Sequence, residues 1–449
     1  MPLGRRMIAR AIALSLLAFA WSALPARAQM GPVLTGAGPI NRSMAGAAVA
    51  APIDATGSLF WNPATSSALP SSSLDFGMEI LWPQTVVDSS LPANAFGPGI
   101  PAVPLAGSNR ADNGIFPLPS AGLVYRPEDS MMTYGLGMFA VAGFGVNYPA
   151  SDPFPKTNPI LTPQFPNGFG FGNIFSELQV LQIVPTASIQ VTDRLSIGGG
   201  PTVDIATLRL DPLVIAAPDA NGQYPPGAHT RMTWGGGFEV GAFYILGGGW
   251  QIGASYKSPQ WFEAFHFQSM DELGRPRSVT FNAELPMVVS AGVGYTGLER
   301  WVFAADFRWV DFEDAAGFRR SGFSPAGAVL GVGFRSIFAM SLGAQYLLTN
   351  NISVRAGYSF NQDPVRDNLT IFSVAAPTNL EHTLYVGASY RVTDALSLSL
   401  AYVHGFENSI TGPYITPLTG PIPGSSVQYT TSADTFLIGA TVRFGCNVN

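Results

Sequence analysis

Cysteine and charge are scarce in this sequence of 449 residues. Cys446 is the only cysteine, so no disulfide forms within the chain and the fold depends on hydrogen bonds and burial. Charged residues make up 12% of the sequence, against about 25% in an average soluble domain, whereas hydrophobic residues reach 47%. Because 30 Phe, 14 Tyr and 8 Trp offer ample apolar surface, a disordered chain is excluded.

Motifs for catalysis and for nucleic-acid binding are also missing. The net charge is −6 and no basic run is present, which excludes a nucleic-acid partner. The sequence has no P-loop, no G-x-S-x-G and no H-E-x-x-H. We therefore expect no enzyme activity, no cofactor and no metal ion.

Long apolar runs are confined to the N-terminus. Three arginines precede an apolar run over residues 11–24, and Ala26-Arg27-Ala28 follows as an A-x-A cleavage site. This order predicts a secretory signal peptide over residues 1–28. Beyond it no segment has 18 consecutive apolar residues, which excludes a helical membrane protein.

What the sequence does contain is alternation with a period of two. From Leu396 the chain reads L-S-L-S-L-A-Y-V-H, which places leucines and Tyr402 on one face of a strand and serines on the other. Many segments share this pattern, and each has one apolar face. They indicate a barrel whose outside meets lipid and whose inside is polar. A large secreted β-sandwich or propeller is the soluble alternative, but it would leave many of these apolar faces uncovered.

Fourteen strands are predicted, separated alternately by tight turns and long loops. Short turns on one rim, long loops on the other and an even strand number are typical of bacterial outer-membrane barrels. The expected fold is all-β, a 14-stranded antiparallel transmembrane β-barrel in the outer membrane of a Gram-negative bacterium. The strands are predicted near residues 74–86, 118–126, 131–148, 176–191, 195–210, 231–246, 249–266, 278–295, 300–313, 333–347, 352–361, 381–391, 396–406 and 432–444.

Such a barrel has a lumen wider than its wall side chains can fill, so another part of the chain must occupy it. Ionisable side chains on the lumen side are expected to pair across the interior. Alternatively, a cation among them receives an acidic head group of a ligand. The candidates for this role are Arg231, Lys257 and Arg335.

Two segments depart from the alternating pattern. An exposed loop rich in aromatics either folds on itself or meets an apolar ligand. The candidate hydrophobic ligand-binding residues in the loop 149–175 are Phe154, Ile160, Leu161, Phe165, Phe169, Phe171 and Phe175. The third strand is apolar on both faces, which predicts a strand that is either buried or kinked, and a kink would open a lateral gap in the wall. The glycines expected at this opening are Gly135, Gly137, Gly143 and Gly145.

The segment after the signal peptide resembles a known family. Residues 36–70 read GAGPINRSMAGAAVAAPIDATGSLFWNPATSSALP, with Asn62-Pro63-Ala64 after an Ala/Gly-rich stretch. This resembles the start of mature chains in the FadL-type long-chain fatty acid and hydrocarbon transporter family, and the predicted architecture downstream agrees. The resemblance implies a hatch over residues 29–72 inside a barrel formed by residues 73–449. The hatch would include Phe60, Trp61, Asn62, Pro63 and Ala64.

The resemblance also implies passive uptake of long-chain fatty acids or similar hydrophobic compounds. Ligand would bind among the outer loops, pass to a pocket gated by the hatch from Gln29 onward, and leave sideways at the third strand. The expected partners are a hydrophobic small molecule and outer-membrane lipid, and the chain is expected to be a monomer. A general porin is the alternative, followed by an outer-membrane lipid-acting enzyme whose Ser and His meet across strands.

Overall fold

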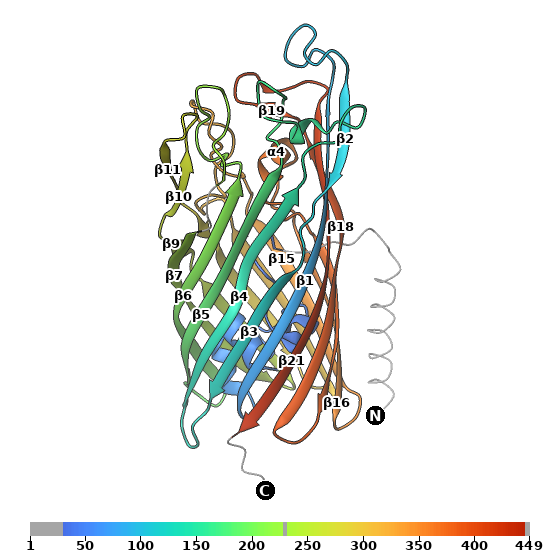
Figure 1. The fold of residues 1–449 in the computed structure, drawn as a ribbon. Coiled ribbons are helices and arrows are strands. Elements are labelled where there is room, and N and C mark those ends of the chain that lie inside the picture. Colours follow the sequence, from blue (N-terminus) through green and yellow to red (C-terminus); the bar gives the residue numbers. More distant parts are fainter. Residues whose placement is uncertain (1–29, 228–230, 445–449) are drawn as a thin grey trace.

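The computed structural model describes residues 30–227 and 231–444. The predicted signal peptide, Gln29 and Cys446 lie outside these residues. Fourteen antiparallel strands close into a barrel, and the N-terminal segment folds inside it, drawn in blue in Figure 1. The predicted fold class is therefore confirmed. Among the described residues, no helix is long and apolar enough to cross a membrane.

The wall strands follow one another around the barrel in chain order, each paired with the next. The ring closes where the first strand pairs with the last, from Ser72 opposite Phe444 to Ser90 opposite Ser426. The wall strands are β1 (Ser72–Leu91), β3 (Phe116–Tyr125), β4 (Met132–Tyr148), β5 (Ile174–Gln190), β6 (Leu195–Asp211), β7 (Arg231–Gly247), β8 (Trp250–Lys257), β13 (Met287–Tyr295), β14 (Trp301–Asp311), β15 (Ile337–Leu347), β16 (Ile352–Asn361), β17 (His382–Arg391), β18 (Leu396–Gly412) and β21 (Ser426–Phe444).

Exposure separates the two faces of the wall as the alternation predicts. On β18, Leu398 and Leu400 are 50% and 63% exposed, whereas Ser397 and Ser399 are 4% and 3% exposed. Leucines therefore point outward and serines point into the lumen. An apolar outer face and a polar inner face are what a barrel in lipid requires.

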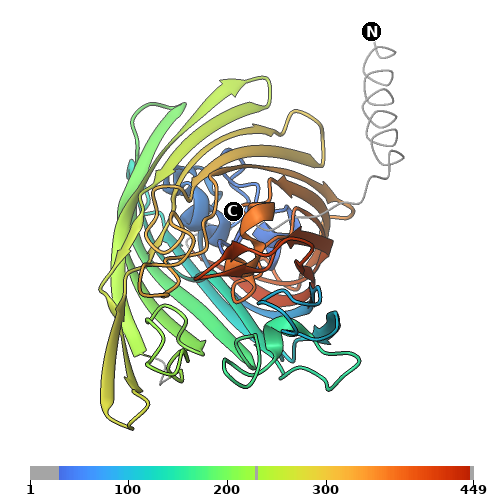
Figure 2. The ribbon, with the colours of Figure 1, turned by 90° about the horizontal axis from the view of Figure 1, so that it is seen from above.

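The strands predicted over residues 249–266 and 278–295 are interrupted in the structure. β8 ends just before Pro259, and Pro286 precedes β13; proline cannot donate a hydrogen bond to the ladder. Between them, β9 (Gln260–Phe262) pairs with β12 (Glu284–Leu285). β10 (Phe265–Met270) and β11 (Pro276–Phe281) form a hairpin that stands out from the wall (Figures 1 and 2).

Other strands are longer than predicted on the side of the long loops. β18 and β21 stay paired up to Gly412 and Val427, and β1 pairs near its end with β2 (Leu105–Arg110). β19 (Ile415–Thr416) and β20 (Gly420–Pro421) form a small hairpin between β18 and β21. The sequence between residues 407 and 431 predicts a loop because its apolar positions do not alternate.

The outer loops fold over the mouth of the barrel, as the view from above in Figure 2 shows. They contain η2 (Pro159–Leu161), η3 (Asp367–Leu369) and α4 (Thr370–Ser373). Leu161, Phe318 and Ile371 from three of these loops belong to one buried apolar cluster with inward residues of the wall. The mouth is therefore covered by packed loops.

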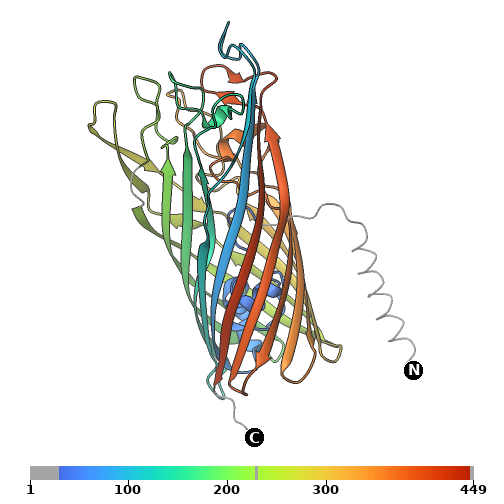
Figure 3. The same cartoon turned by 45° about the vertical axis from the view of Figure 1, so that its right-hand side comes forward.

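The N-terminal segment forms three short helices inside the barrel, in the half next to the short turns (Figures 1 and 3). They are α2 (Pro39–Ser43), α3 (Ala55–Trp61) and η1 (Pro63–Ala68). Asp54 caps α3 by accepting a hydrogen bond from the Gly57 N–H, and Asn62 caps η1 in the same way. No single apolar face is visible in this segment because the wall surrounds it on all sides, and α3 is buried throughout. We call residues 30–70 the hatch.

Candidate functional site

Glycines in the wall allow the hatch to approach the strands closely. A Cβ atom on Gly241 of β7 would lie 2.0 Å from Asn62 Oδ1, and one on Gly253 of β8 would lie 2.0 Å from the Val49 carbonyl oxygen. No real Cβ atom tolerates such distances, so only glycine fits at these positions. On other strands a Cβ atom would lie less than 3.0 Å from a hatch atom at Gly198, Gly292, Gly294, Gly343, Gly357, Gly387 and Gly439.

Asn62 links the hatch to itself and to the wall. Its Nδ2 donates to the Val49 carbonyl at 2.7 Å and to the Ala242 carbonyl of β7 at 3.0 Å. Its Oδ1 accepts from the Ala64 N–H at 3.1 Å. Asn62 is fully buried, so all three bonds form away from water. The asparagine of the Asn62-Pro63-Ala64 motif thus fixes the middle of the hatch.

An ion pair in the wall holds the first part of the hatch. Asp306 of β14 accepts from the backbone N–H groups of Ala48 and Val49 at 2.8 and 3.1 Å. Its partner Arg308, at 2.8 Å, donates to the Gly46 carbonyl at 2.7 Å. The Arg308 guanidinium also lies 3.8 Å from the centre of the Trp61 ring. Paired lumen charges therefore bind the hatch here.

Lys257, one of the three predicted head-group cations, is also engaged by the hatch. Its ammonium lies 3.3 Å from Glu239 and donates to Gln182 Oε1 at 3.1 Å. It also donates to the Phe60 carbonyl at 3.1 Å and lies 4.9 Å from the centre of the Phe60 ring. The Lys257 ammonium therefore has one ion-pair partner and two hydrogen-bond acceptors within the protein.

The other two predicted cations lie elsewhere. Arg335 Nε donates to the Asp363 carbonyl at 2.7 Å in the outer loops, and Arg231 is exposed where β7 begins. The structure does not bring the three cations together. Within the described part of the chain, none of them lines the pockets described below.

The wall has a gap between β3 and β4. β3 pairs with β1 as far as Phe116, but it pairs with β4 only from Ser120 to Tyr125. Pro117 and Pro119 are two residues apart, so their missing N–H groups belong to the same edge of β3. Because the pairing with β1 continues past them, the affected edge is the one that faces β4.

On the other side of the gap, β4 contains a bulge at Val141. Ala140 and Ala142 flank the shift in register against β5. A bulge adds one residue, bends the strand and reverses which residues face inward. Gly143 and Gly145 beyond the bulge thus lie on the outer face of the wall.

The start of the hatch fills the gap from inside. The Leu34 N–H donates to the Val141 carbonyl at 2.9 Å, and the Gly143 N–H donates to the Pro32 carbonyl at 2.9 Å. Residues 32–34 thus take the place that β3 leaves empty. Further along, a Cβ atom on Gly145 would lie 2.6 Å from Phe116 Cζ, so the Phe116 ring lies against this glycine.

An apolar pocket of ≈ 270 Å³ adjoins the gap. None of its lining side chains is charged. The residues that line it include Leu34, Phe116, Leu118, Ala142, Gly143, Phe144, Gly145, Leu178, Val180, Pro377, Thr378 and Leu380. The pocket is thus bounded by both edges of the gap, by the hatch and by the loop before β17.

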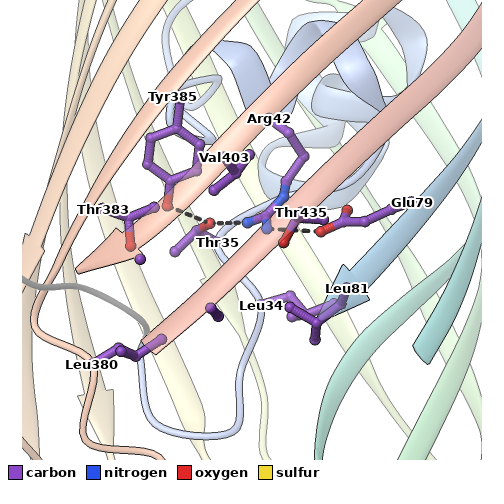
Figure 4. Close-up of a pocket in the computed structure, with 12 residues that line it drawn as sticks. Leu34, Thr35, Arg42, Glu79, Leu81, Leu380, Thr383, Tyr385, Val403 and Thr435 are labelled. Atoms are coloured by element: carbon purple, nitrogen blue, oxygen red, sulfur yellow. Dashed lines mark hydrogen bonds and ion pairs between the residues drawn. The ribbon is translucent and has the colours of Figure 1, made fainter. Parts of the chain in front are cut away.

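A second, smaller pocket of ≈ 30 Å³ lies beside it and is polar on one side. Figure 4 shows a row of hydrogen-bonded side chains from Tyr385 through Thr35 and Arg42 to Glu79, with three leucines beside the row. Arg42 of the hatch forms an ion pair with Glu79 of β1 at 2.8 Å. The two pockets share Leu34, Leu81, Leu380 and Ala433 in their walls.

The four predicted glycines of the third strand divide into two pairs. Gly143 and Gly145 line the apolar pocket at the gap. Gly135 lies against Leu59 of the hatch, since a Cβ there would be 2.3 Å from Leu59 Cδ2, and Gly137 lies beside Phe139 and Leu59. The first pair therefore lies at the gap, and the second gives room to the hatch.

The seven apolar residues of the loop 149–175 are not brought into a single site. Ile160 and Leu161 in η2 are fully buried, whereas Phe154 and Phe165 are 67% and 65% exposed. Phe169 stacks on Phe96 with ring centres 5.0 Å apart. The ring centres of Phe171 and Tyr224 are 5.8 Å apart. The Arg209 guanidinium lies 4.3 Å from the centre of the Phe175 ring on β5.

Several residues around the pockets could not be singled out from the sequence. Leu34, Leu380 and Tyr385 come from distant parts of the chain and carry no local pattern. Pro117 and Pro119 are different, because two prolines at alternate positions of a predicted strand mark an edge that cannot donate hydrogen bonds. That signal would have located the gap.

A closed 14-stranded barrel with polar lumen, apolar outer face and internal hatch defines an outer-membrane transport protein. Over residues 16–445 the chain matches the family described as outer membrane protein transport protein (OMPP1/FadL/TodX), and it belongs to that family. Proteins of this family carry hydrophobic compounds across the outer membrane. No curated protein sequence matches the chain.

Solved structures of transport proteins share the fold. The toluene transporter TodX of P. putida has a TM-score of 0.64 at 18% identity, covering 92% of this chain and 100% of that one. The toluene transporter TbuX of Ralstonia pickettii has a TM-score of 0.63 at 19% identity, covering 91% of this chain and 99% of that one. A FadL homologue of Pseudomonas aeruginosa has a TM-score of 0.67 at 16% identity, covering 92% of this chain and 100% of that one. Identities this low show a common fold.

Proposed function

We propose that this protein takes up small hydrophobic compounds passively, through the apolar pocket and sideways through the gap between β3 and β4. The observation that carries the proposal is the position of the pocket. Both edges of the gap line it, and so does Leu34 from the segment that fills the gap. Leu34 and Phe116, which both contact β4 at the gap or beside it, thus also contact a ligand in the pocket.

The size and chemistry of the pocket favour a small neutral compound. An apolar cavity of about 150 Å³ accommodates benzene, and this pocket has ≈ 270 Å³. Its lining carries no charge, and the Lys257 ammonium that could meet a fatty acid carboxylate is bound to Glu239 and to the hatch. Two similar structures are of toluene transporters, which supports the same substrate class here. Long-chain fatty acids are the competing substrate.

Apolar side chains at the outer surface offer a first contact for such compounds. Phe154 and Phe165 are largely exposed on the loop 149–175, and the same loop contributes Phe169 to a stack with Phe96. Exposed aromatic patches of this kind are costly in water and favour binding of apolar molecules. We propose that ligands collect there before entering the pocket.

Uptake measured in cells that lack other transporters of this family would test the proposal. We expect expression of the protein to accelerate uptake of labelled toluene more than uptake of labelled oleate. The double variant Pro117→Val and Pro119→Val restores two N–H donors on β3, so β3 and β4 should pair along the gap and uptake should fall at least tenfold. Pro201→Val, which alters a proline of β6 away from the gap, is the control.

Two outcomes would contradict the proposal. Unchanged uptake by the double proline variant would exclude the lateral route. A large steady ion conductance of the purified protein in planar bilayers would instead identify a general porin. Faster uptake of oleate than of toluene would keep the function but replace the substrate by long-chain fatty acids.

A further inference from the structure

The small polar pocket has room for one additional group of a ligand. Its volume of ≈ 30 Å³ exceeds the about 10–15 Å³ that a cavity needs to hold one water molecule, so one small polar group fits. Because it shares four wall residues with the apolar pocket, a ligand whose hydrocarbon body lies in the apolar pocket could extend one small polar group into it. Figure 4 shows Leu34 and Leu81 of the shared wall just below the polar row, with Leu380 further from it.

Arg42, which lines this pocket, has one donor without a protein acceptor among the described residues. Arg42 uses Nη2 for Glu79 and Nη1 for the Thr35 hydroxyl, but its Nε–H is buried and has no partner among the described residues. Arg42 itself is only 6% exposed. A buried donor without an acceptor is unfavourable, so a small shift that brings a ligand oxygen within reach of Nε would remove this cost.

The charges of the pocket favour a neutral group over an anion. Arg42 is the only cation in its lining, and Glu79 already neutralises it at 2.8 Å. A ligand carboxylate would approach the Glu79 carboxylate and compete with it for the same guanidinium. A hydroxyl group meets no such repulsion, because its oxygen can accept from Arg42 while its hydrogen is donated to a neighbouring oxygen.

Two side chains of the wall supply further hydroxyl groups. The Tyr385 hydroxyl lies 3.0 Å from the hydroxyls of Thr35 and Ser359, and Thr435 lines the pocket from β21. Each hydroxyl can either donate or accept. The lining of the pocket thus combines the Arg42 guanidinium with hydroxyl groups that can take either role.

We propose that the polar pocket binds the hydroxyl group of a neutral ligand, such as a phenol or an alcohol, whose hydrocarbon body occupies the apolar pocket. This inference rests on the proposed uptake of hydrophobic compounds and narrows their class. A site that makes hydrogen bonds to a hydroxyl group discriminates against analogues without one, because its buried polar groups are then left unpaired. The protein would therefore prefer hydroxylated hydrocarbons to plain hydrocarbons and to carboxylates.

Calorimetric titration of the purified full-length barrel in detergent would test this with toluene, 4-methylphenol and 4-methylbenzoate, which share one ring and one methyl group. We expect 4-methylphenol to bind about tenfold more tightly than toluene, which corresponds to one or two net hydrogen bonds. 4-Methylbenzoate should bind most weakly. The variants Thr435→Val and Tyr385→Phe should each weaken 4-methylphenol about fivefold and leave toluene within about twofold.

Tyr358→Phe is the matched control, since Tyr358 lies on the neighbouring strand β16 and bonds His382 instead of the pocket. It should leave all three affinities unchanged.

If 4-methylphenol and toluene bind equally in the native protein and in both variants, the pocket holds only a structural water and the inference is wrong, while hydrophobic uptake stands. Tightest binding of 4-methylbenzoate would also overturn it. If none of the three compounds binds, the proposed function itself fails. Thr435→Val keeps the side-chain shape and decides the test if Tyr385→Phe does not fold.

Discussion

Replacement of Asp306 by alanine would remove the carboxylate that holds the first part of the hatch. Asp306 and Arg308 are 0% and 1% exposed, and the carboxylate also binds the N–H groups of Ala48 and Val49. Breaking a buried ion pair by removing one partner costs about 3–5 kcal/mol, because the other charge stays buried. The equilibrium between docked and undocked hatch should therefore shift by about 10²- to 10³-fold, at about 1.4 kcal/mol per tenfold.

Single-barrel conductance in planar bilayers measures this shift. We expect the native barrel to stay closed and the Asp306→Ala barrel to show frequent large openings, since undocking of the hatch exposes the lumen. Asp306→Asn keeps one acceptor for the Ala48 N–H and should open less often. Asp193→Ala, an exposed aspartate of the turn between β5 and β6, is the control and should behave like the native protein. An Asp306→Ala barrel with native strand content that stays closed would refute the reasoning.

Two further predictions concern the packing and the pH dependence of the hatch. Gly253→Ala places a Cβ atom 2.0 Å from the Val49 carbonyl oxygen, so the thermal midpoint of unfolding should fall by several degrees. Gly405→Ala is the control. Its Cβ atom would come no closer than 3.0 Å to the flexible Leu380 side chain, so the midpoint should change little. Burial and the neighbouring Asp75 carboxylate raise the pKa of Asp54 to about 7, above about 3.9 in an unfolded chain. Between about pH 4 and pH 7 the folded hatch thus holds a proton on Asp54 that the unfolded chain releases. The contribution of this proton to the free energy of unfolding is complete below about pH 4 and is lost as the pH rises to about 7. Asp54→Asn keeps the helix cap and should make the urea midpoint less dependent on pH in this window. An unchanged pH slope would show that Asp54 does not contribute to it.

The sequence predicted the wall far better than the contacts inside it. Strand number and the two faces follow from a period of two that is visible within ten residues, as at Leu398 and Ser399. The interruptions at Pro259 and Pro286 carry a local signal too, because proline cannot join the ladder. By contrast, Asp306 binds Ala48 from 258 residues away, and no local pattern contains that information.

The same limit applies to the loop 149–175 and to the pockets. Its aromatic content is evident from the sequence, but only the folded loop decides that Leu161 is buried and that Phe165 is exposed. Lys257 was a reasonable candidate for a ligand head group by its position on the lumen face. Its pairing with Glu239 and with the Phe60 carbonyl depends on how the hatch packs, which a strand pattern does not encode.

The contacts of the hatch also indicate which part of it moves during transport. Residues 32–34 are held at the gap by two backbone hydrogen bonds, worth about 1 kcal/mol each. Leu34 lines the ligand pocket, so a bound ligand can replace the apolar contacts that this side chain loses when it leaves. Opening the gap then costs about 2 kcal/mol.

Undocking the helices of the hatch would cost much more. It breaks the buried pair between Arg42 of the hatch and Glu79 of the wall, at about 3–5 kcal/mol. It also breaks the three hydrogen bonds that Asp306 and Arg308 of the wall make to backbone groups of residues 46–49, at about 1.5–3 kcal/mol each. A difference of at least 4 kcal/mol favours movement of residues 32–34 alone by about 10³-fold. We therefore infer that ligand passes sideways at β4 while α2, α3 and η1 stay docked and keep the lumen closed to ions.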